Sequence, residues 1–266
     1  MDFHHYGQSE AAAVVLNRYL AITSDDNRES LALLPLFLSM RAAIRSHVLL
    51  ARLDRMNNGR DHLKSIAQNY FELARRSISP PPAKLIAVGG LSGTGKSVLA
   101  RALAGLTEPL PGAVILRSDV IRKRLFDVAE TDRLPVSAYQ PDITQRVYQT
   151  LTERAAGILA QGHSVIVDAV YAQEAERAMI SRSVSDMKLS FCGIFLTADL
   201  ATRIRRIGQR VNDASDATSE FARVQDDYDI GSIDWAMIDA NGTPERTLQL
   251  SKAALGRHAV HEPPRE

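Results

Sequence analysis

The chain has 266 residues, of which 45% are hydrophobic, so it can bury a substantial core in one large domain or two small ones. Its formal net charge of +1 excludes the strong overall field expected of a protein that coats nucleic acid or is drawn to a membrane surface. The single cysteine, Cys192, excludes an internal disulfide, and its apolar surroundings in the sequence predict a buried structural thiol in a reducing compartment.

The first part of the chain shows neither an export signal nor a membrane span. Residues 1–10 are polar and lack the order of basic and then apolar residues that marks a signal peptide. The longest apolar stretch, 31–40, is interrupted by Pro35 and Ser39 and is shorter than the roughly twenty residues that a membrane span requires. These features predict a soluble, cytoplasmic protein with no membrane contact.

Residues 1–79 have the apolar periodicity of α-helices and predict a small all-helical unit of three helices. The periodic positions are Ala13, Leu16 and Leu20, then Leu36, Met40, Ile44, Val48 and Leu49, then Leu63, Ile66, Tyr70 and Leu73. Three consecutive prolines then stop any helix and stiffen the connection, so residues 80–83 are predicted to be a linker.

From Lys84 onward, short apolar runs alternate with helix-length segments, which predicts an α/β fold with a five-stranded parallel sheet covered on both faces. The predicted strands are 85–88, 113–116, 164–167, 189–196 and 236–238. Residues 143–160 form the most regular predicted helix, with Gly162 as its stop signal. We expect this domain to span 84–257 and to be followed by a flexible tail at 258–266.

A phosphate-binding loop directly follows the first predicted strand. Residues 90–97 read G-x-x-x-x-G-K-S, in which glycines let the backbone N–H groups point inward at phosphate oxygens. Lys96 is expected to reach the β- and γ-phosphates and Ser97 to ligate Mg²⁺. The predicted ATP-binding residues are Gly90, Ser92, Gly93, Thr94, Gly95, Lys96, Ser97 and Val98. The alternative is an ordinary glycine-rich turn.

Asp168 ends the strand predicted at 164–167, so its carboxylate lies at the edge where open α/β sheets bind ligands. There it is predicted to hold Mg²⁺ beside Ser97, directly or through a water molecule. The alternative role is a capping aspartate at a turn from strand to helix.

Asp119 follows the strand predicted at 113–116 and begins a helix that contains Arg122, Lys123 and Arg124. A carboxylate near the transferred phosphoryl group suits a general base that deprotonates an acceptor hydroxyl, with the nearby cations attracting phosphate or an anionic acceptor. The alternative is simple helix capping by Ser118 and Asp119, with the cations merely solvated.

A third cluster is basic and contains Arg203, Arg205, Arg206 and Arg210. Arginines suit a lid over a triphosphate, because their charge is permanent and their donors fork onto phosphate oxygens. Arg206 and Arg210 are four residues apart and are predicted to share one helical face, whereas Arg205 points away to solvent. The alternative is an ordinary basic helix that pairs with Asp213 or Asp216.

Two further positions are candidates for ligand contact. Asn241 follows the last predicted strand and is predicted to border the adenine, although an Asn-Gly turn explains the same residues. Acceptor specificity is expected between the helix after Asp119 and the segment 129–141, where Tyr139 and Gln140 offer stacking and hydrogen bonds.

Four motifs together resemble one group of bacterial proteins. These motifs are the loop G-G-L-S-G-T-G-K-S and the stretches L-R-S-D-V-I-R-K-R-L-F, S-V-I-V-D-A-V and D-A-S-D-A-T. The chain is similar to the AAA-type P-loop kinase-like ATPases that are fused behind an aminoglycoside-phosphotransferase-like domain. More distantly it resembles zeta toxin, chloramphenicol phosphotransferase, gluconate kinase and polynucleotide kinase. The resemblance implies a P-loop NTPase fold with a sheet of nucleoside-kinase type.

The resemblance also implies roles for individual residues. In those relatives an aspartate after the second strand is the base, which corresponds to Asp119, and the next arginine, here Arg122, contacts the acceptor. Lid arginines embrace the phosphates, and Arg206 and Arg210 are the best matches. The His-Gly-Asp and Asn sequence of the fused half is missing, and residues 1–79 look like the trailing helices of that half. The chain is therefore a shortened natural version or a fragment, and no aminoglycoside chemistry is expected.

Together these features predict a phosphotransferase that depends on ATP and Mg²⁺ and acts on a hydroxyl of a small molecule. The alternative is a regulatory ATPase or nucleotide-driven switch that acts on a protein partner through the helical unit. A third class, phosphorylation of nucleic-acid ends, follows from the likeness to polynucleotide kinase, and the near-neutral composition argues against it.

Overall fold

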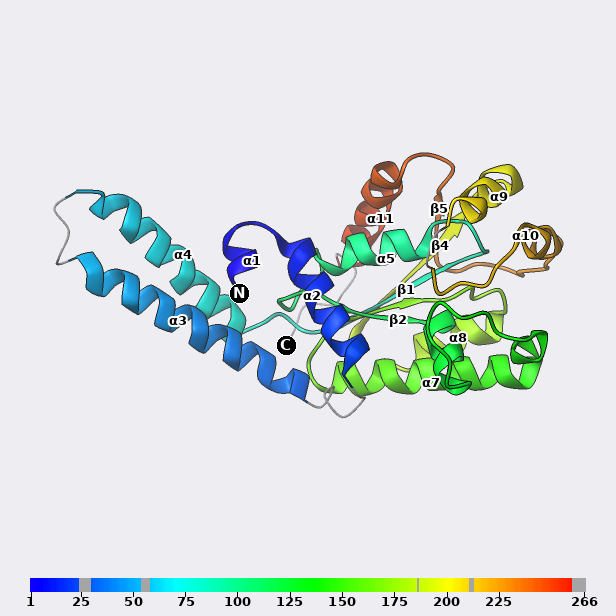
Figure 1. Ribbon diagram of the computed structural model, residues 1–266, viewed down its shortest axis with the longest axis horizontal. Coiled ribbons are helices and arrows are strands. Elements are labelled where there is room, and N and C mark those ends of the chain that lie inside the picture. The colour runs from blue at the N-terminus through cyan, green and yellow to red at the C-terminus, as the bar shows by residue number, and fades with distance from the viewer. Residues whose placement is uncertain (24–29, 54–57, 186, 211–212, 260–266) are drawn as a thin grey trace. The chain divides into compact units, whose positions relative to one another are not determined.

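The computed structural model describes residues 1–23, 30–53, 58–185, 187–210 and 213–259 of the chain. It consists of two compact units (Figure 1). The first unit comprises residues 1–83, 104–114 and 161–164, and the second comprises 84–103, 115–160 and 165–266. The first unit thus takes in two segments that lie far along the chain from its helices.

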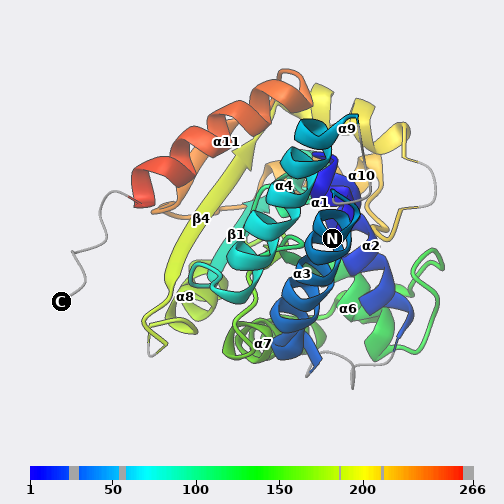
Figure 2. The same cartoon turned by 90° about the vertical axis from the view of Figure 1, so that its left-hand side faces the viewer.

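The first unit is helical, as predicted. Its helices are α1 (Asp2–His5), α2 (Ser9–Ile22), α3 (Leu34–Leu53) and α4 (Arg60–Ile78). Helices α3 and α4 lie side by side (Figures 1 and 2) and share a core of Ala42, Tyr70, Leu73 and Ala74. Asn17 on α2 donates from its amide to the carbonyl of Ala113 at 3.0 Å, which attaches one of the later segments to this unit.

Helix α3 buries a different face from the one that its large apolar residues mark. Met40 and Ile44 are 51% and 55% exposed, whereas Ala42 and Ser46 are buried. The Ser46 hydroxyl donates to the carbonyl of Ala67 on α4 at 2.8 Å. Small side chains let two helices approach closely, so the sequence periodicity located the helix but not its contact face.

Helix length also changes the expectation about membrane spans. Among the described residues, the helical stretch Ser30–Leu53 is long and apolar enough to cross a membrane, and 11% of its most apolar window is buried. The apolar stretch 31–40 is by itself too short for a membrane span, but the helix continues beyond it through a second apolar run. A single helix of this kind is weak support for a span, because core helices and signal sequences meet the same criteria.

The second unit is an α/β domain, as predicted. Its strands are β1 (Lys84–Gly90), β2 (Val114–Arg117), β3 (Val165–Asp168), β4 (Ser190–Thr197) and β5 (Ala236–Asp239), in the spatial order β2-β3-β1-β4-β5. Its helices are α5 (Lys96–Ala104), α6 (Ser118–Leu125), α7 (Pro141–Ala160), α8 (Glu174–Arg182), α9 (Leu200–Gly208), α10 (Ser219–Asp226) and α11 (Pro244–Ala259), with a short 3-10 helix η2 (Val136–Tyr139). Figure 1 shows α5 and α11 on one side of the sheet and α7 and α8 on the other.

The parallel register decides which loops meet. Strand β1 pairs with β3 and with β4 in parallel, and Val88 lies opposite Asp168. The carboxyl ends of parallel strands share one edge of a sheet, so the segments that follow β1, β2 and β3 converge there. The two central strands that lead to this edge are buried, along all of β3 and all of β1 after Lys84.

The predictions for the core are confirmed at Cys192, which is a free, buried thiol whose pKa is raised by burial to about 11. Its neighbour Gly193 has a packing role, since a Cβ at that position would collide with the ring of Trp235. Trp235 is only 6% exposed and fills this space.

Candidate active site

The loop between β1 and α5 has the backbone shape that the glycine pattern predicted. Gly90, Gly93 and Gly95 have φ values of +133°, +89° and +100°, a region that favours glycine. A Cβ on Gly93 would also lie 2.6 Å from the carbonyl oxygen of Arg203. Glycine at 93 therefore serves both the curl of the loop and the close approach of α9.

Two side chains that follow β4 in sequence brace the loop at Ser92. Its N–H donates to Oε1 of Gln225 on α10 at 2.8 Å, and its carbonyl accepts from Nε of Arg203 on α9 at 2.9 Å. Arg203 is buried and also donates to Asp226 at 2.8 Å. The basic cluster in the sequence contained Arg203 without revealing this role, and no local signal pointed to Gln225.

Lys96 folds back onto its own loop, where Nζ donates to the carbonyl of Leu91 at 3.1 Å. Desolvation lowers the pKa of Lys96, and the negative charges of Asp168 and Asp119 oppose that shift. The ammonium group thus lies among the groups that the sequence assigned to phosphate, metal and base.

Ser97 and Asp168 are in direct contact, with the Ser97 hydroxyl donating to Oδ2 of Asp168 at 2.5 Å. Asp168 is 4% exposed and ends β3, next to the strand that leads into the loop. A hydroxyl and a carboxylate oxygen are the hard ligands that Mg²⁺ prefers, so this pair fits that ion. The structure brings together the two residues that the sequence proposed as metal ligands.

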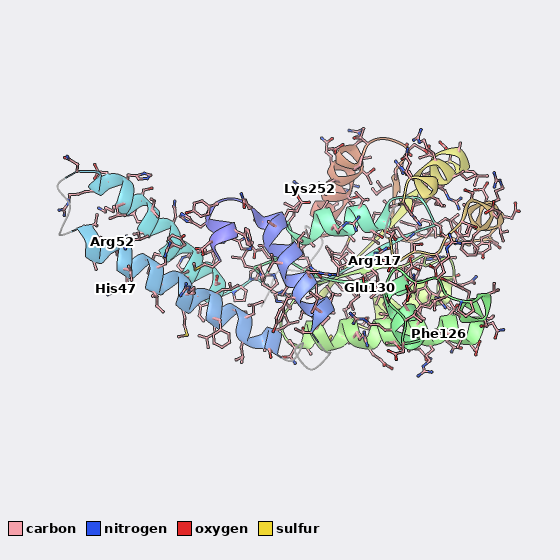
Figure 3. The ribbon with its side chains drawn as sticks, in the orientation of Figure 1. His47, Arg52, Arg117, Phe126, Glu130 and Lys252 are labelled. Carbon is pink, nitrogen blue, oxygen red and sulfur yellow. The ribbon has the colours of Figure 1, made fainter. Side chains whose placement is uncertain are left out.

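Arg117 is a site residue that the sequence motifs did not identify. It is the last residue of β2 and is labelled in Figure 3. Its Nε lies 3.3 Å from Oδ2 of Asp168, and its Nη2 donates to Oδ1 of Asp213 at 3.0 Å. The guanidinium of Arg117 therefore links the carboxylate of Asp168 at the end of β3 to that of Asp213, which precedes α10.

Asp119 lies in the first turn of α6, at the same edge of the sheet. Desolvation and the nearby charge of Asp168 raise its pKa, while Arg117, Lys96 and a hydrogen bond from Ser215 act in the opposite direction. A carboxylate with a raised pKa beside a phosphate site suits proton transfer. The capping alternative lacks support, because the N-cap residue of α6 is Arg117 and no side-chain cap bond forms there.

The cations of α6 are not solvated, so that alternative is wrong for two of them. Arg122 and Lys123 are 6% and 1% exposed. Arg122 donates to the carbonyl of Ala138 at 2.6 Å, and its Cζ lies 4.8 Å from the ring centre of Tyr139. Lys123 donates to the carbonyl of Asp132 at 2.6 Å. Both cations hold the segment that precedes α7 against α6.

Asp216 closes this side of the site. It accepts hydrogen bonds from the Tyr139 hydroxyl at 2.8 Å, from Lys123 Nζ at 3.0 Å and from the N–H of Leu134 at 3.1 Å. Burial raises the pKa of Tyr139, so its hydroxyl stays a donor at neutral pH. In the contacts that the structure describes, Asp213 and Asp216 pair with Arg117 and Lys123 rather than with arginines of α9, contrary to the alternative prediction.

The arginines predicted to form the lid occupy different environments. Helix α9 ends at Gly208, so Arg206 and Arg210 do not share a helical face, and that prediction is wrong. Arg206 donates to the carbonyls of Thr94, Ala240 and Gly242 at 3.3, 2.8 and 2.9 Å. The Nη1 atom of Arg210 is buried and has no hydrogen-bond partner among the described residues. Arg205 is exposed, as predicted.

Asn241 follows β5 and its side chain is held by the chain around it. Its Oδ1 accepts from the N–H of Asp199 at 2.9 Å, and its Nδ2 donates to Asp239 at 2.9 Å. These bonds stabilise the connection after β5. The predicted contact of Asn241 with adenine stays a prediction.

The fold and this site together define a class. A glycine-rich loop after β1, a lysine and a serine at the start of α5, and an aspartate at the end of the adjacent strand are the features of a P-loop nucleotide-binding protein. Residues 85–228 match the family model described as the AAA domain. The chain belongs to that family.

Relatives matched over nearly the whole chain come from mycobacteria. An uncharacterised protein of Mycobacterium tuberculosis (strain H37Rv) is 29% identical over 256 residues, which cover 93% of this chain and 49% of that protein. A protein of Mycobacterium bovis matches with the same identity and coverage. The chain therefore spans about half the length of the curated relatives that it matches.

The solved structures with a similar fold include two sugar-related kinases. A sugar kinase from Janibacter sp. aligns with a TM-score of 0.50 and 16% identity, covering 69% of this chain and 100% of that one. A gluconokinase from Sinorhizobium meliloti aligns with a TM-score of 0.47 and 18% identity, covering 68% and 98%. At these identities the likeness extends to the kinase-like P-loop fold alone.

Proposed function

We propose that the protein is a phosphotransferase that moves the γ-phosphate of ATP to a hydroxyl of a small molecule, with Mg²⁺ as its metal. The observation that carries the proposal is the position of Asp119, whose carboxylate interacts electrostatically with both Lys96 and Asp168 at one edge of the sheet. A protein that only binds nucleotide needs no carboxylate of raised pKa beside its phosphate site. The sugar kinase that shares the fold is in keeping with this class of reaction.

The phosphates of ATP are assigned to the loop amides and Lys96. The hydrogen bonds from Ser92 to the side chains of Gln225 and Arg203 hold the loop in shape before the ligand arrives. The loop therefore needs little reorganisation when ATP binds. Ser97 and Asp168 are assigned to Mg²⁺, which when bound neutralises charge on the phosphate oxygens. Their present hydrogen bond keeps the two oxygen ligands together.

Asp119 is assigned as the general base that accepts the proton of the acceptor hydroxyl. Its raised pKa makes it a better proton acceptor than an ordinary surface aspartate, while the charges of Arg117 and Lys96 favour its ionised form. The acceptor is assigned to the neighbourhood of Tyr139 and Arg122, whose side chains stack on each other. Their ring and guanidinium offer stacking and hydrogen bonding to a polar small molecule.

Arg206 and Arg210 are assigned to stabilise the negative charge that develops on the phosphate oxygens during transfer. Arg210 has a buried nitrogen without a hydrogen-bond partner among the described residues, so it retains a donor for a phosphate oxygen. Arg206 joins the loop at Thr94 to the residues after β5, where Asn241 is assigned to the adenine.

Two wider expectations remain part of the proposal. We infer a cytoplasmic location from the nucleotide chemistry, since ATP and Mg²⁺ are abundant in that compartment. We also infer that the longer relatives combine this domain with an aminoglycoside-phosphotransferase-like half. The coverage of 49% of the Mycobacterium tuberculosis protein leaves room for a second half of that size.

The test is a transfer screen with γ-labelled ATP and Mg²⁺ against sugars, antibiotics, nucleotides and oligonucleotides, with hydrolysis in the absence of any acceptor as background. We expect labelled product with one small-molecule class, and loss of that product with Lys96→Ala protein of unchanged circular dichroism. Lys84→Ala, at the partly buried start of β1, is the matched control. Transfer to none of the acceptors, with hydrolysis stimulated by a protein partner, would instead support a nucleotide-driven switch.

A further inference from the structure

Arg117, at the end of β2, has a buried polar atom without a hydrogen bond. Its Nε is buried and has no hydrogen-bond partner among the residues that the structure describes. The atom lies 3.3 Å from Oδ2 of Asp168, which is a contact between charges rather than a hydrogen bond. Native proteins leave few buried donors unpaired, because each one lacks the hydrogen bonds that water would supply. The Nε–H group of Arg117 is therefore a donor that a ligand can use.

The other end of the guanidinium is fixed by Asp213. Nη2 of Arg117 donates to Oδ1 of Asp213 at 3.0 Å. The same oxygen accepts from the N–H of Ser215 at 2.8 Å, which keeps the Asp213 carboxylate in place. The side chains of Arg117 and Asp213 are 18% and 23% exposed, so this ion pair is screened by solvent less than a surface pair is. Asp213 thus aligns the guanidinium and leaves other N–H donors of Arg117 available.

Arg117 differs in its partners from two neighbouring arginines. Arg203 and Arg206 each donate to backbone carbonyls, at distances of 2.8 to 3.3 Å. Carbonyl groups are fixed parts of the fold, so these bonds serve the structure of the loop and of the chain around it. Arg117 instead faces two carboxylates, and one of them belongs to the proposed metal ligand Asp168. Its surroundings are those of the site rather than those of the scaffold.

The position of Arg117 in the sheet places it on the acceptor side of the phosphates. Strand β3 separates β2 from β1, and the phosphate-binding loop follows β1. The proposed base Asp119 follows Arg117 by two residues. Burial acts to lower the pKa of Arg117, but the charges of Asp168, Asp213 and Asp119 together raise it, so the guanidinium stays charged among three carboxylates. The part of ATP that meets both the metal ligand and the base is its γ-phosphoryl group.

We propose that Arg117 is a further catalytic residue, whose guanidinium donates to an oxygen of the transferred γ-phosphoryl group and is aligned for this contact by Asp213. The inference rests on the proposed function, in which ATP is the donor and Asp119 the base. The acceptor oxygen forms a bond to the γ-phosphorus, the bond from that phosphorus to the bridging oxygen breaks and leaves its electron pair on ADP, and the acceptor proton passes to Asp119. A planar, permanent cation stabilises the charge spread over the γ-phosphoryl oxygens in this step.

The alternative role of Arg117 is that of a counter-ion, which only neutralises the charge of Asp168. The two roles differ in their dependence on the nucleotide. Mg²⁺ accompanies ADP as well as ATP, so a counter-ion to the metal ligand acts on the binding of both. A contact with the γ-phosphoryl group acts only on a nucleotide that has one. A comparison of the ATP analogue AMPPNP with ADP therefore separates the two roles.

The first test is calorimetry of AMPPNP and of ADP, both with Mg²⁺, and it needs no acceptor. In Arg117→Gln the affinity for AMPPNP should fall about tenfold or more relative to that for ADP, as expected for the loss of a hydrogen bond between charged groups. Arg117→Lys keeps the charge but lacks the forked donors, so it should show a smaller relative loss. Asp213→Ala leaves the guanidinium unaligned and should also show a relative loss. An equal change for both nucleotides in Arg117→Gln, or no change, would overturn the proposal.

The control is Arg101→Gln, which removes the same charge from an exposed position on α5. Its ratio of AMPPNP to ADP affinity should match that of the wild-type protein, and a shift equal to that of Arg117→Gln would overturn the proposal. Circular dichroism checks the fold of each variant. If Arg117→Gln does not fold, Arg117→Lys decides, and a wild-type ratio in that variant would overturn the proposal.

Failure of the proposed function has a different outcome. A wild-type protein that binds neither nucleotide would refute the phosphotransferase function itself. Normal binding of both nucleotides, with the same affinity ratio in the wild-type protein and in Arg117→Gln, would refute only the role of Arg117.

The second test uses the acceptor found in the transfer screen. Arg117→Gln should lower kcat about 10²-fold, with the KM for the acceptor nearly unchanged, because the contact stabilises the transferred group and does not bind the acceptor. Arg101→Gln should keep the wild-type kcat. A wild-type kcat in Arg117→Gln, or an equal loss in both variants, would show that Arg117 takes no part in the transfer step.

Discussion

The hydroxyl of Ser97 and the carboxylate of Asp168 meet at 2.5 Å although 71 positions separate them in the chain. The parallel pairing of β1 with β3 creates this meeting, since it places the loop after one strand beside the last residue of the other. Arg117 approaches the same carboxylate oxygen from β2. The edge of the sheet thus concentrates a serine, an arginine and an aspartate from three separate segments.

The metal assignment predicts a specific loss in Asp168→Asn. The amide cannot supply the anionic oxygen that Mg²⁺ prefers, so the increase in AMPPNP affinity on adding Mg²⁺ should disappear while binding without the metal remains. Calorimetry with and without Mg²⁺ measures the difference. Asp239→Asn, at the exposed end of β5, is the matched control and should keep the Mg²⁺ effect. A full Mg²⁺ effect in Asp168→Asn would contradict the assignment.

The base assignment predicts that Asp119→Asn lowers phosphoryl transfer about 10²- to 10⁴-fold and leaves AMPPNP affinity nearly unchanged. For the wild-type protein, transfer should decline as the pH falls through the raised pKa of Asp119, because only the ionised carboxylate accepts a proton. Initial rates between pH 4.5 and 8 test both statements. Equal rates in the two proteins would point to the switch-like function instead.

The same substitution should stabilise the fold. The pKa of Asp119 is raised in the folded protein, so burial of its ionised form opposes folding: its stabilising contribution is present at low pH and is lost as the pH rises through the folded-state pKa. Asp119→Asn should therefore increase the free energy of unfolding at pH 7.5 more than at pH 4. Urea denaturation at the two pH values gives the comparison, and a loss of stability at pH 7.5 would contradict it.

The brace on the phosphate-binding loop predicts an effect away from the nucleotide. Gln225→Ala leaves the buried N–H of Ser92 without its 2.8 Å partner, which should cost about 1–3 kcal/mol of unfolding free energy. AMPPNP binding should weaken as well, because the loop is no longer held in shape before the ligand arrives. Gln209→Ala, at an exposed position after α9, serves as the control. Equal stability of the two variants would show that the loop supports itself.

Local patterns were sufficient for much of the site. The glycines of 90–97 need positive φ, and Lys96 and Ser97 follow them by direct sequence continuity, so a short motif specifies both the loop shape and its chemistry. Asp168 and Asp119 were identifiable because each lies at or just beyond the end of an apolar strand. The edge of a parallel sheet is the same place for all strands, so strand ends predict proximity without knowledge of the full fold.

Other features depend on contacts that leave no local trace. The sequence assigned Arg206 and Arg210 to one helical face, but the helix ends at Gly208 and separates them. Large apolar residues marked one side of α3, whereas the packing against α4 uses Ala42 and Ser46. Helix termini and contact faces are decided by the partner surface as much as by the helix itself.

By itself, the sequence determined the class of protein, the phosphate-binding loop, the alternation of strands and helices, and the two strand-end aspartates. The tertiary structure decided the pairing of Arg117 with Asp213, the brace of Gln225 on Ser92 and the hydrogen bonds of Lys123 and Tyr139 with Asp216. The first set follows from backbone conformation and apolar periodicity, which act over a few neighbouring residues. The second set depends on which buried polar groups meet across the fold, and only the packed chain brings those groups together.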